Sequence, residues 1–148
     1  MLSQAVGYAA TALGCIATMG GKPVLVREIA GACGIPTAYL AKIVNVLARK
    51  GILQTQRGVR GGVSLLRPAA TLTLHDLCVA LGDPSVQNRC MLSTEPCSDD
   101  RGCPAHCFWR EHREREVAFL KRTTVADIAA FETRRRWSET RRRALLRR

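Results

Sequence analysis

Apolar residues recur at helical spacing in three successive segments near the start of the chain. They are three or four positions apart from about residue 3 to residue 18, and this run ends at Gly20-Gly21. The same spacing predicts a short second helix over residues 26–33. Gly34-Ile35-Pro36 then makes a turn, and Pro36 suits the first position of a third helix.

The third predicted helix, PTAYLAKIVNVLARKG, divides into two faces when each residue advances by about 100°. One face is apolar and carries Leu40, Ile43, Val44 and Leu47. The opposite stripe is narrow and carries Ala38, Lys42, Asn45 and Arg49. Such a stripe is often only a solvated helix face, but its side chains can also reach phosphates and base edges, as those of a DNA recognition helix do.

A basic hairpin is predicted directly after this helix. Two short β-prone runs, Ile52 to Gln56 and Val63 to Leu66, flank the glycine-rich sequence RGVRGG. Glycines allow the protein backbone to come close to the sugar-phosphate backbone of DNA, and Arg57 and Arg60 supply positive charge. This order of elements favours a winged helix-turn-helix: a mainly α fold with a small β-hairpin wing and a DNA-binding domain over residues 1–72.

Further helices are predicted after residue 72. Thr73 with Asp76 indicates a capped helix over 74–81, a long helix begins near Pro104, and a short helix follows over 125–131. The long helix should form a dimer seam from Trp109 to Leu120, interrupted by His112 and Glu116 but retaining apolar side chains at Phe108, Trp109, Val117, Phe119 and Leu120. We therefore expect residues 73–131 to hold a loop and dimerisation helices, and the chain to be a homodimer.

Charge is concentrated at one end of the chain. The net charge of the 148 residues is +11, and positions 134–148 contribute eight arginines and one glutamate. Residues 132–148 are expected to be a basic, disordered tail, because charge runs are usually solvated. No stretch has the length of a membrane span, and the apolar N-terminal segment lacks the basic region of a secretory signal. We expect a cytoplasmic protein with reduced thiols.

Four of the seven cysteines and one of the three histidines fall between residues 90 and 107. The spacing is Cys90-x6-Cys97-x5-Cys103-x2-His106-Cys107, in a segment too polar and turn-rich to bury thiols by packing. Thiolates with an imidazole suit tetrahedral zinc or an iron-sulfur cluster, and the spacing alone leaves both open. Cys15, Cys33 and Cys78 have apolar neighbours and are expected in the core.

An enzyme is not expected from this sequence. It has no C-x2-C pair in a βαβ setting, no phosphate-cradling glycine loop and no candidate pair of catalytic carboxylates. The basic hairpin beside the polar helix stripe favours a DNA-binding protein instead.

The segment YLAKIVNVLARKGILQTQRGVRGGVSLLRPAATLTLHDL, followed by RC...C...C..HCFW, resembles the IscR/NsrR/RirA family of bacterial iron-sulfur transcription regulators. The likeness extends over about residues 1–130 and is nearest to the IscR-like subtype. It implies that Cys90, Cys97 and Cys103 bind an iron-sulfur cluster. His106 matches the histidine that completes a 2Fe-2S cluster in IscR-like members.

The fourth ligand is where this chain departs from its apparent relatives. NsrR-like members use an aspartate from the first helix of the partner subunit, just before its tyrosine, whereas Gly7 precedes Tyr8 here. This weakens the 4Fe-4S interpretation, although that cluster type stays open. Cys107 is an alternative fourth ligand beside His106, but neighbours on a helix point about 100° apart, and we favour His106.

The resemblance implies a regulator, more often a repressor than an activator. Its cluster state would control its affinity for a pseudo-palindromic site in double-stranded DNA. The signal would be redox state, nitric oxide, or the supply of iron or clusters. A zinc-stabilised winged-helix module that binds DNA or protein without sensing anything is the alternative. The residues expected at DNA are Thr37, Ala38, Tyr39, Lys42, Asn45, Arg49, Arg57 and Arg60.

Overall fold

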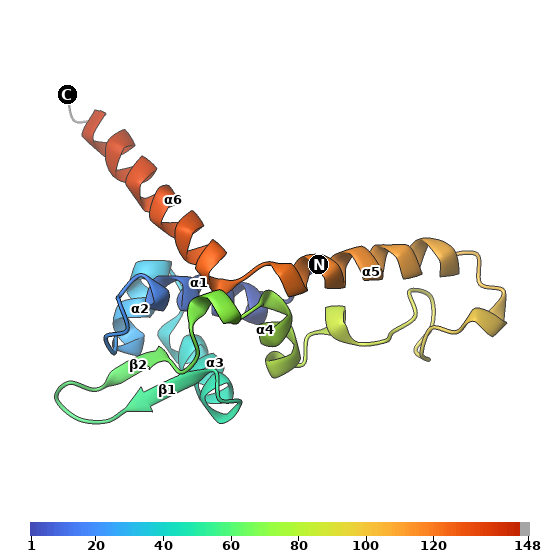
Figure 1. Ribbon diagram of the computed structural model, residues 1–148, viewed down its shortest axis with the longest axis horizontal. Helices are drawn as coiled ribbons and strands as arrows, with labels where there is room; N and C mark the ends of the chain where they lie inside the picture. The colour runs from blue at the N-terminus through green and yellow to red at the C-terminus, as the bar shows by residue number, and fades with distance from the viewer. Residues whose placement is uncertain (146–148) are drawn as a thin grey trace.

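The structure is a computed structural model that describes residues 1–145, with side chains described as far as Arg135. A head is formed by the helices α1 (Gln4–Ala17), α2 (Val26–Cys33), α3 (Thr37–Arg49) and α4 (Leu74–Leu81) with the strands β1 (Leu53–Gln56) and β2 (Gly62–Leu65). Two further helices, α5 (His106–Arg122) and α6 (Val125–Leu145), leave this head in different directions (Figure 1). The predicted winged helix-turn-helix is confirmed.

The core lies where α1 crosses the other helices of the head. Leu13 of α1 and Leu40 and Leu47 of α3 are fully buried, as the helical spacing predicts. Gly14 of α1 meets α6 so closely that a Cβ atom there would lie 2.9 Å from Cγ2 of Ile128. A small residue at this position therefore allows α1 and α6 to pack against each other.

The wing is an antiparallel pair of strands that is also fastened to the segment between α1 and α2. β1 and β2 pair from Leu53 with Leu65 to Gln56 with Gly62. Val63 exchanges two backbone hydrogen bonds with Val24, at 2.8 and 3.0 Å. Gly62 has a positive φ of 152°, and a Cβ atom there would lie 2.7 Å from the Val24 backbone. Glycine at residue 62 thus permits the wing to dock on the head.

Two short contacts join the head to the junction between α5 and α6. The Leu74 N–H donates to the Thr123 carbonyl at 2.9 Å, and the Val125 N–H donates to the Leu72 carbonyl at 2.8 Å. Leu120, which we expected on a dimer seam, is 1% exposed and belongs to the chain's own core. That part of the seam prediction was wrong, because the last turns of α5 pack beside α4.

The last helix is longer than predicted. α6 continues beyond residue 131 to Leu145, so most of the segment that we expected to be a disordered tail is helical, and residues 146–148 lie outside the described part of the chain. No glycine or proline interrupts this stretch, and its arginines and glutamates favour helix. Glu132 also pairs with Arg135 at 2.8 Å, one turn further along.

Within residues 1–145, no single helix is long and apolar enough to cross a membrane. The bent pair of α2 and α3 passes that test by length and composition only, with a bend of 120° between the two helices.

Candidate DNA-binding face and cysteine loop

The two faces of α3 are arranged as the sequence predicts. Its apolar residues are buried in the head, and the opposite stripe is exposed: Ala38, Lys42, Asn45 and Arg49. Thr37 is exposed in the first turn. Tyr39 is 38% exposed, and its ring forms a T-shaped contact with the ring of Tyr8 in α1, with the ring centroids 5.7 Å apart. Tyr39 thus combines packing with an exposed hydroxyl-bearing ring.

A groove separates α2 and α3 from the wing. It encloses about 520 Å³, and its lining includes Asn45 from α3 and Arg57 and Gly58 from the hairpin tip. The structure therefore brings Asn45 and Arg57 to one surface feature, whereas Lys42, Arg49 and Arg60 are exposed outside its lining.

Arg27 is a residue of this groove that the sequence analysis missed. It is exposed on the second position of α2 and lines the groove together with Asn45 and Arg57. The signal was present, since Ile29 and Ala30 are buried and leave Arg27 on the outer face of this short helix. It adds a guanidinium group to a surface already rich in positive charge.

The cysteine loop, residues 87–105, lies along α5, at the far end of the molecule from the wing (Figure 1). Side chains of α5 hold the beginning of this loop. Trp109 donates from its indole N–H to the Arg89 carbonyl at 2.8 Å. Arg113 donates to the Gln87 carbonyl at 2.9 Å and to Oδ1 of Asn88 at 2.6 Å. These bonds place Cys90 next to the first turns of α5.

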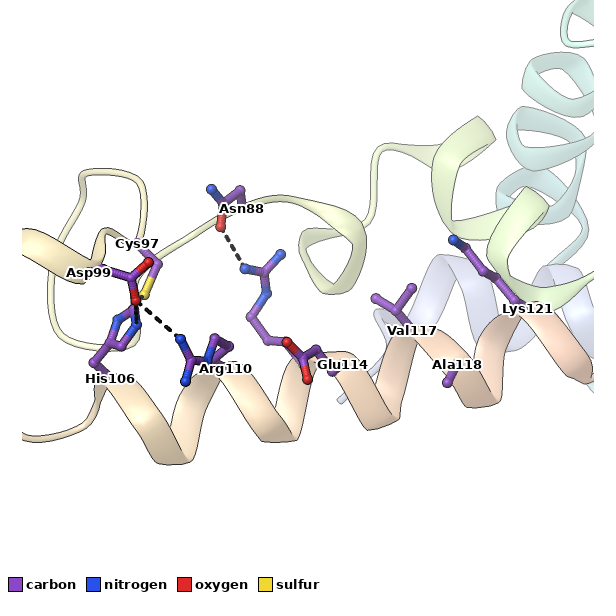
Figure 2. Close-up of a pocket in the computed structure, with 10 residues that line it drawn as sticks. Asn88, Cys97, Asp99, His106, Arg110, Glu114, Val117, Ala118 and Lys121 are labelled. Carbon is purple, nitrogen blue, oxygen red and sulfur yellow. Dashed lines mark hydrogen bonds and ion pairs between the residues drawn. The ribbon is translucent and has the colours of Figure 1, made fainter.

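The end of the loop meets the first turn of α5 through His106. Nδ1 of His106 lies 3.3 Å from Sγ of Cys97, and Nε2 lies 2.7 Å from Oδ1 of Asp99. Arg110 donates to the same Asp99 oxygen at 3.2 Å. Figure 2 shows these four side chains at one end of a pocket of about 520 Å³ between the loop and α5.

The three spaced cysteines are all half-buried, and they lie close enough to affect one another's pKa values. The Leu92 backbone N–H is the main cause that lowers the pKa of Cys90, which favours its thiolate. Burial first, and then the negative charges of Cys90 and Cys103, raise the pKa of Cys97. Cys90 and Cys97 therefore each affect the pKa of the other, and Cys103 affects that of Cys97.

The remaining members of the predicted site differ in their surroundings. The His106 side chain is 14% exposed, whereas Cys107 beside it is exposed. In the described part of the chain, no three His, Cys, Asp or Glu side chains are close enough to hold a single metal ion. Cys15 and Cys78 are buried and Cys33 is half-buried against the core, in agreement with the prediction.

A winged helix-turn-helix head with an exposed, basic recognition face defines a DNA-binding transcription regulator. The chain belongs to the Rrf2 family, described as iron-dependent transcriptional regulators, whose family model matches residues 2–130. Members of this family regulate transcription and are not enzymes, and membership implies DNA binding.

Curated relatives agree with this assignment. The chain is 33% identical over 134 residues to an HTH-type transcriptional regulator of Aquifex aeolicus, covering 89% of this chain and 93% of that protein. It is 36% identical over 128 residues to the protein aau3 of Rhizobium meliloti, covering 86% and 83% of the two chains. It is 28% identical over 106 residues to IscR of Yersinia pseudotuberculosis, covering 72% and 64%.

Solved structures share the fold at lower identity. CymR, the global cysteine regulator of B. subtilis, has a TM-score of 0.72 at 23% identity and covers 88% of this chain and 97% of its own. IscR of T. potens has a TM-score of 0.71 at 22% identity and covers 89% and 88%. At these identities the likeness establishes the fold alone.

Proposed function

We propose that this Rrf2-family regulator holds an iron-sulfur cluster through Cys90, Cys97, Cys103 and His106, and that the cluster controls its affinity for DNA. The observation that carries this proposal is the 3.3 Å approach of His106 Nδ1 to Cys97 Sγ, where the loop meets α5. Two otherwise separate parts of the spaced motif, the middle of the loop and the first turn of α5, come together there.

The donor set fits such a cluster chemically. Three thiols and one imidazole are ligands that iron-sulfur centres accept, and a cluster needs a wider set of donors than one ion does. The low exposure of His106, beside an exposed Cys107, supports His106 as the fourth ligand. This set favours a 2Fe-2S cluster, with 4Fe-4S as the alternative. When bound, the cluster would supply a group that responds to oxidation, nitric oxide or loss of iron.

The route from the loop to the DNA-binding face passes through α4. The loop joins α4 to α5, and α4 packs on both α5 and α3. Ligation at both ends of the loop would restrict α5 relative to α4, and α4 contacts the helix that carries the recognition stripe. A change in cluster state would therefore shift the population of chains whose heads can bind DNA.

The DNA partner in this proposal is a pseudo-palindromic duplex bound by a homodimer in the cytoplasm. Three phenylalanine rings on α5 and α6 support association with a second copy, since Phe108, Phe119 and Phe131 are 64%, 46% and 52% exposed. Each α3 would enter a major groove, with the wing on the adjacent backbone. The proposed contacts are Thr37, Ala38, Tyr39, Lys42, Asn45, Arg49, Arg57 and Arg60, joined by Arg27.

Anaerobic preparation with iron and sulfide tests this proposal. The wild type should show visible cluster absorption, the Cys97→Ala variant should lose it, and Cys107→Ala is the matched control that should keep it. A duplex selected from random sequence by the loaded protein should be bound about ten-fold more tightly or more weakly after cluster removal.

Three results would contradict the proposal. Equal DNA affinity with and without the cluster would reject sensing. Loss of the cluster in Cys107→Ala but not in His106→Ala would replace His106 by Cys107 as the fourth ligand. One zinc per chain without iron, after anaerobic isolation, would favour the zinc-stabilised module instead.

A further inference from the structure

We propose that Asp99 is a positioning residue for His106, and that it makes Nδ1 the nitrogen that is presented to the proposed cluster. This inference rests on the proposed function, because it concerns the fourth ligand of the same site. It assigns roles to a carboxylate and to one ring atom that the spacing of cysteines and histidine does not address.

The imidazole of His106 is held from two opposite directions. On one side Nδ1 faces Cys97 Sγ at 3.3 Å, and on the other Nε2 faces Asp99 Oδ1 at 2.7 Å. An ionised carboxylate only accepts hydrogen bonds, so the short contact to Asp99 places the proton on Nε2. Nδ1 then carries the lone pair, on the side where the cysteines lie.

Asp99 is itself fixed by two neighbours. It begins a short 3-10 turn, Asp99–Arg101, which Ser98 caps by accepting the Asp100 N–H at 3.2 Å. Arg110 lies one helical turn after His106 and donates to the same Asp99 oxygen at 3.2 Å. The carboxylate therefore joins two residues of α5 to the loop (Figure 2).

This arrangement has a general counterpart in metal sites. A histidine that binds metal through one nitrogen commonly donates its other N–H to a carboxylate, which orients the ring and increases its donor strength. Loss of such a partner typically weakens metal binding by about 10- to 100-fold. We expect Asp99 to slow the release of the cluster and to lower its reduction potential, because it places a negative charge against the ligand.

The chain supplies a matched control for this role. Asp100 is the next residue in the same turn, and the hydrogen bonds of its side chain go to Ser98, not to His106. Asp99→Asn and Asp100→Asn change the charge equally and at neighbouring positions. A general electrostatic effect would therefore appear in both variants, whereas a positioning effect would appear only in the first.

The first experiment uses the full-length protein without iron. In ¹⁵N NMR of histidine-labelled protein, the neutral His106 ring should carry its proton on Nε2 in the wild type and in Asp100→Asn. Asp99→Ala should give a mixture of both tautomers. A wild-type ring protonated on Nδ1 would overturn the inference, and this readout stands even if the protein takes up no cluster.

The second experiment uses protein reconstituted with iron and sulfide. Hyperfine coupling in pulsed EPR of the reduced cluster, with ¹⁵N placed only at Nδ1, should identify Nδ1 as the ligand. Asp99→Asn should raise the reduction potential and release iron to a chelator about ten-fold faster than Asp100→Asn does.

Coupling to Nε2, or identical behaviour of the two variants, would overturn the inference. Failure of the wild type to bind iron would contradict the proposed function and the ligand assignment, while leaving the NMR result on Asp99 intact.

Discussion

Asp83 is a buried carboxylate that joins two distant parts of the chain. It is 2% exposed and accepts hydrogen bonds from the Ser3 N–H at 2.9 Å, the Ser85 N–H at 3.0 Å and the Ser85 hydroxyl at 2.6 Å. Ser3 is the residue that caps α1, and Ser85 belongs to the turn that leads from α4 into the cysteine loop. Asp83 therefore connects the N-terminus of α1 to the turn that precedes the cysteine loop.

We predict that protonation of Asp83 lowers the stability of the folded protein in acid. Burial of the carboxyl is the largest single influence and acts to raise its pKa, but the hydrogen bonds from Ser3 and Ser85 together outweigh it and lower the pKa to about 2. Because the folded-state pKa lies below the unfolded-state value, the contribution is fully present above about pH 4 and is lost as the pH falls toward 2. Urea unfolding followed across this range should show it.

The control is Asp83→Asn, which retains the shape of the side chain without its charge. We expect the free energy of unfolding of this variant to be about 1–3 kcal/mol lower than that of the wild type at neutral pH, since hydrogen bonds to a charged, buried acceptor are lost. Its stability should change less between pH 4 and pH 2 than that of the wild type. Parallel pH curves for the two proteins would rule out Asp83 as the source of the acid sensitivity.

Single residues differ in how far their roles could be read from the sequence. The burial of Leu40 and Leu47 follows from helical periodicity alone, and Thr73 with Asp76 forms the capping box that their spacing predicts. Asp83 and Asp99 could not be assigned in this way. Their partners at Ser3 and His106 are set by tertiary packing and by an irregular loop, for which a sequence pattern has no period.

At the scale of elements, the long helix α5 acts as the support of the cysteine loop. Trp109 and Arg113 reach from it to residues 87–89, which are 20 to 26 positions earlier in the chain. The sequence predicts the helix and the loop separately, but their mutual contacts depend on how the chain folds back. The length of α6 differs from the prediction for another reason: a run of charges predicts a solvated tail, whereas the residue types in this run favour helix.

We predict that Arg113→Lys loosens the start of the cysteine loop. Lysine keeps the charge but cannot reproduce two hydrogen bonds from one planar group, which here go to Asn88 Oδ1 and the Gln87 carbonyl. Losing one charge-assisted bond costs about 1.5–3 kcal/mol, so local opening should become about 10- to 150-fold more frequent. Trypsin cleavage after Arg89, measured on folded protein without iron, reports this opening.

Arg115→Lys is the matched control for that measurement. Arg115 lies on the same helix, but its side chain is 82% exposed and pairs only within α5, with Glu111 at 3.3 Å. It should leave the cleavage rate after Arg89 unchanged, because exposed pairs within a helix contribute little. Equal acceleration by both substitutions would mean that Arg113 acts on α5 in general and not on the loop.

At the scale of the whole molecule, the recognition face and the cysteine loop lie at opposite ends, and α4 and α5 connect them (Figure 1). One chain offers one recognition helix and one wing, and a duplex site with two halves needs two heads at a fixed separation. The exposed phenylalanines lie on α5 and α6, so α5, which supports the loop, would also help to set that separation. Dimer geometry and loop order are therefore coupled in the proposed function.

We predict that Phe108→Glu separates the proposed dimer. Phe108 is 64% exposed on the first turn of α5, and a carboxylate there would have to be desolvated at a contact with a second copy. Sedimentation should show a monomer, and affinity for a duplex with two half-sites should fall about 100-fold while affinity for one half-site changes little.

Val59→Glu is the control, since Val59 is fully exposed at the wing tip, between β1 and β2, and belongs to neither α5 nor α6. It should remain dimeric and bind both duplexes more weakly, because it adds negative charge beside the phosphates. A dimeric Phe108→Glu protein would exclude this turn of α5 from the interface.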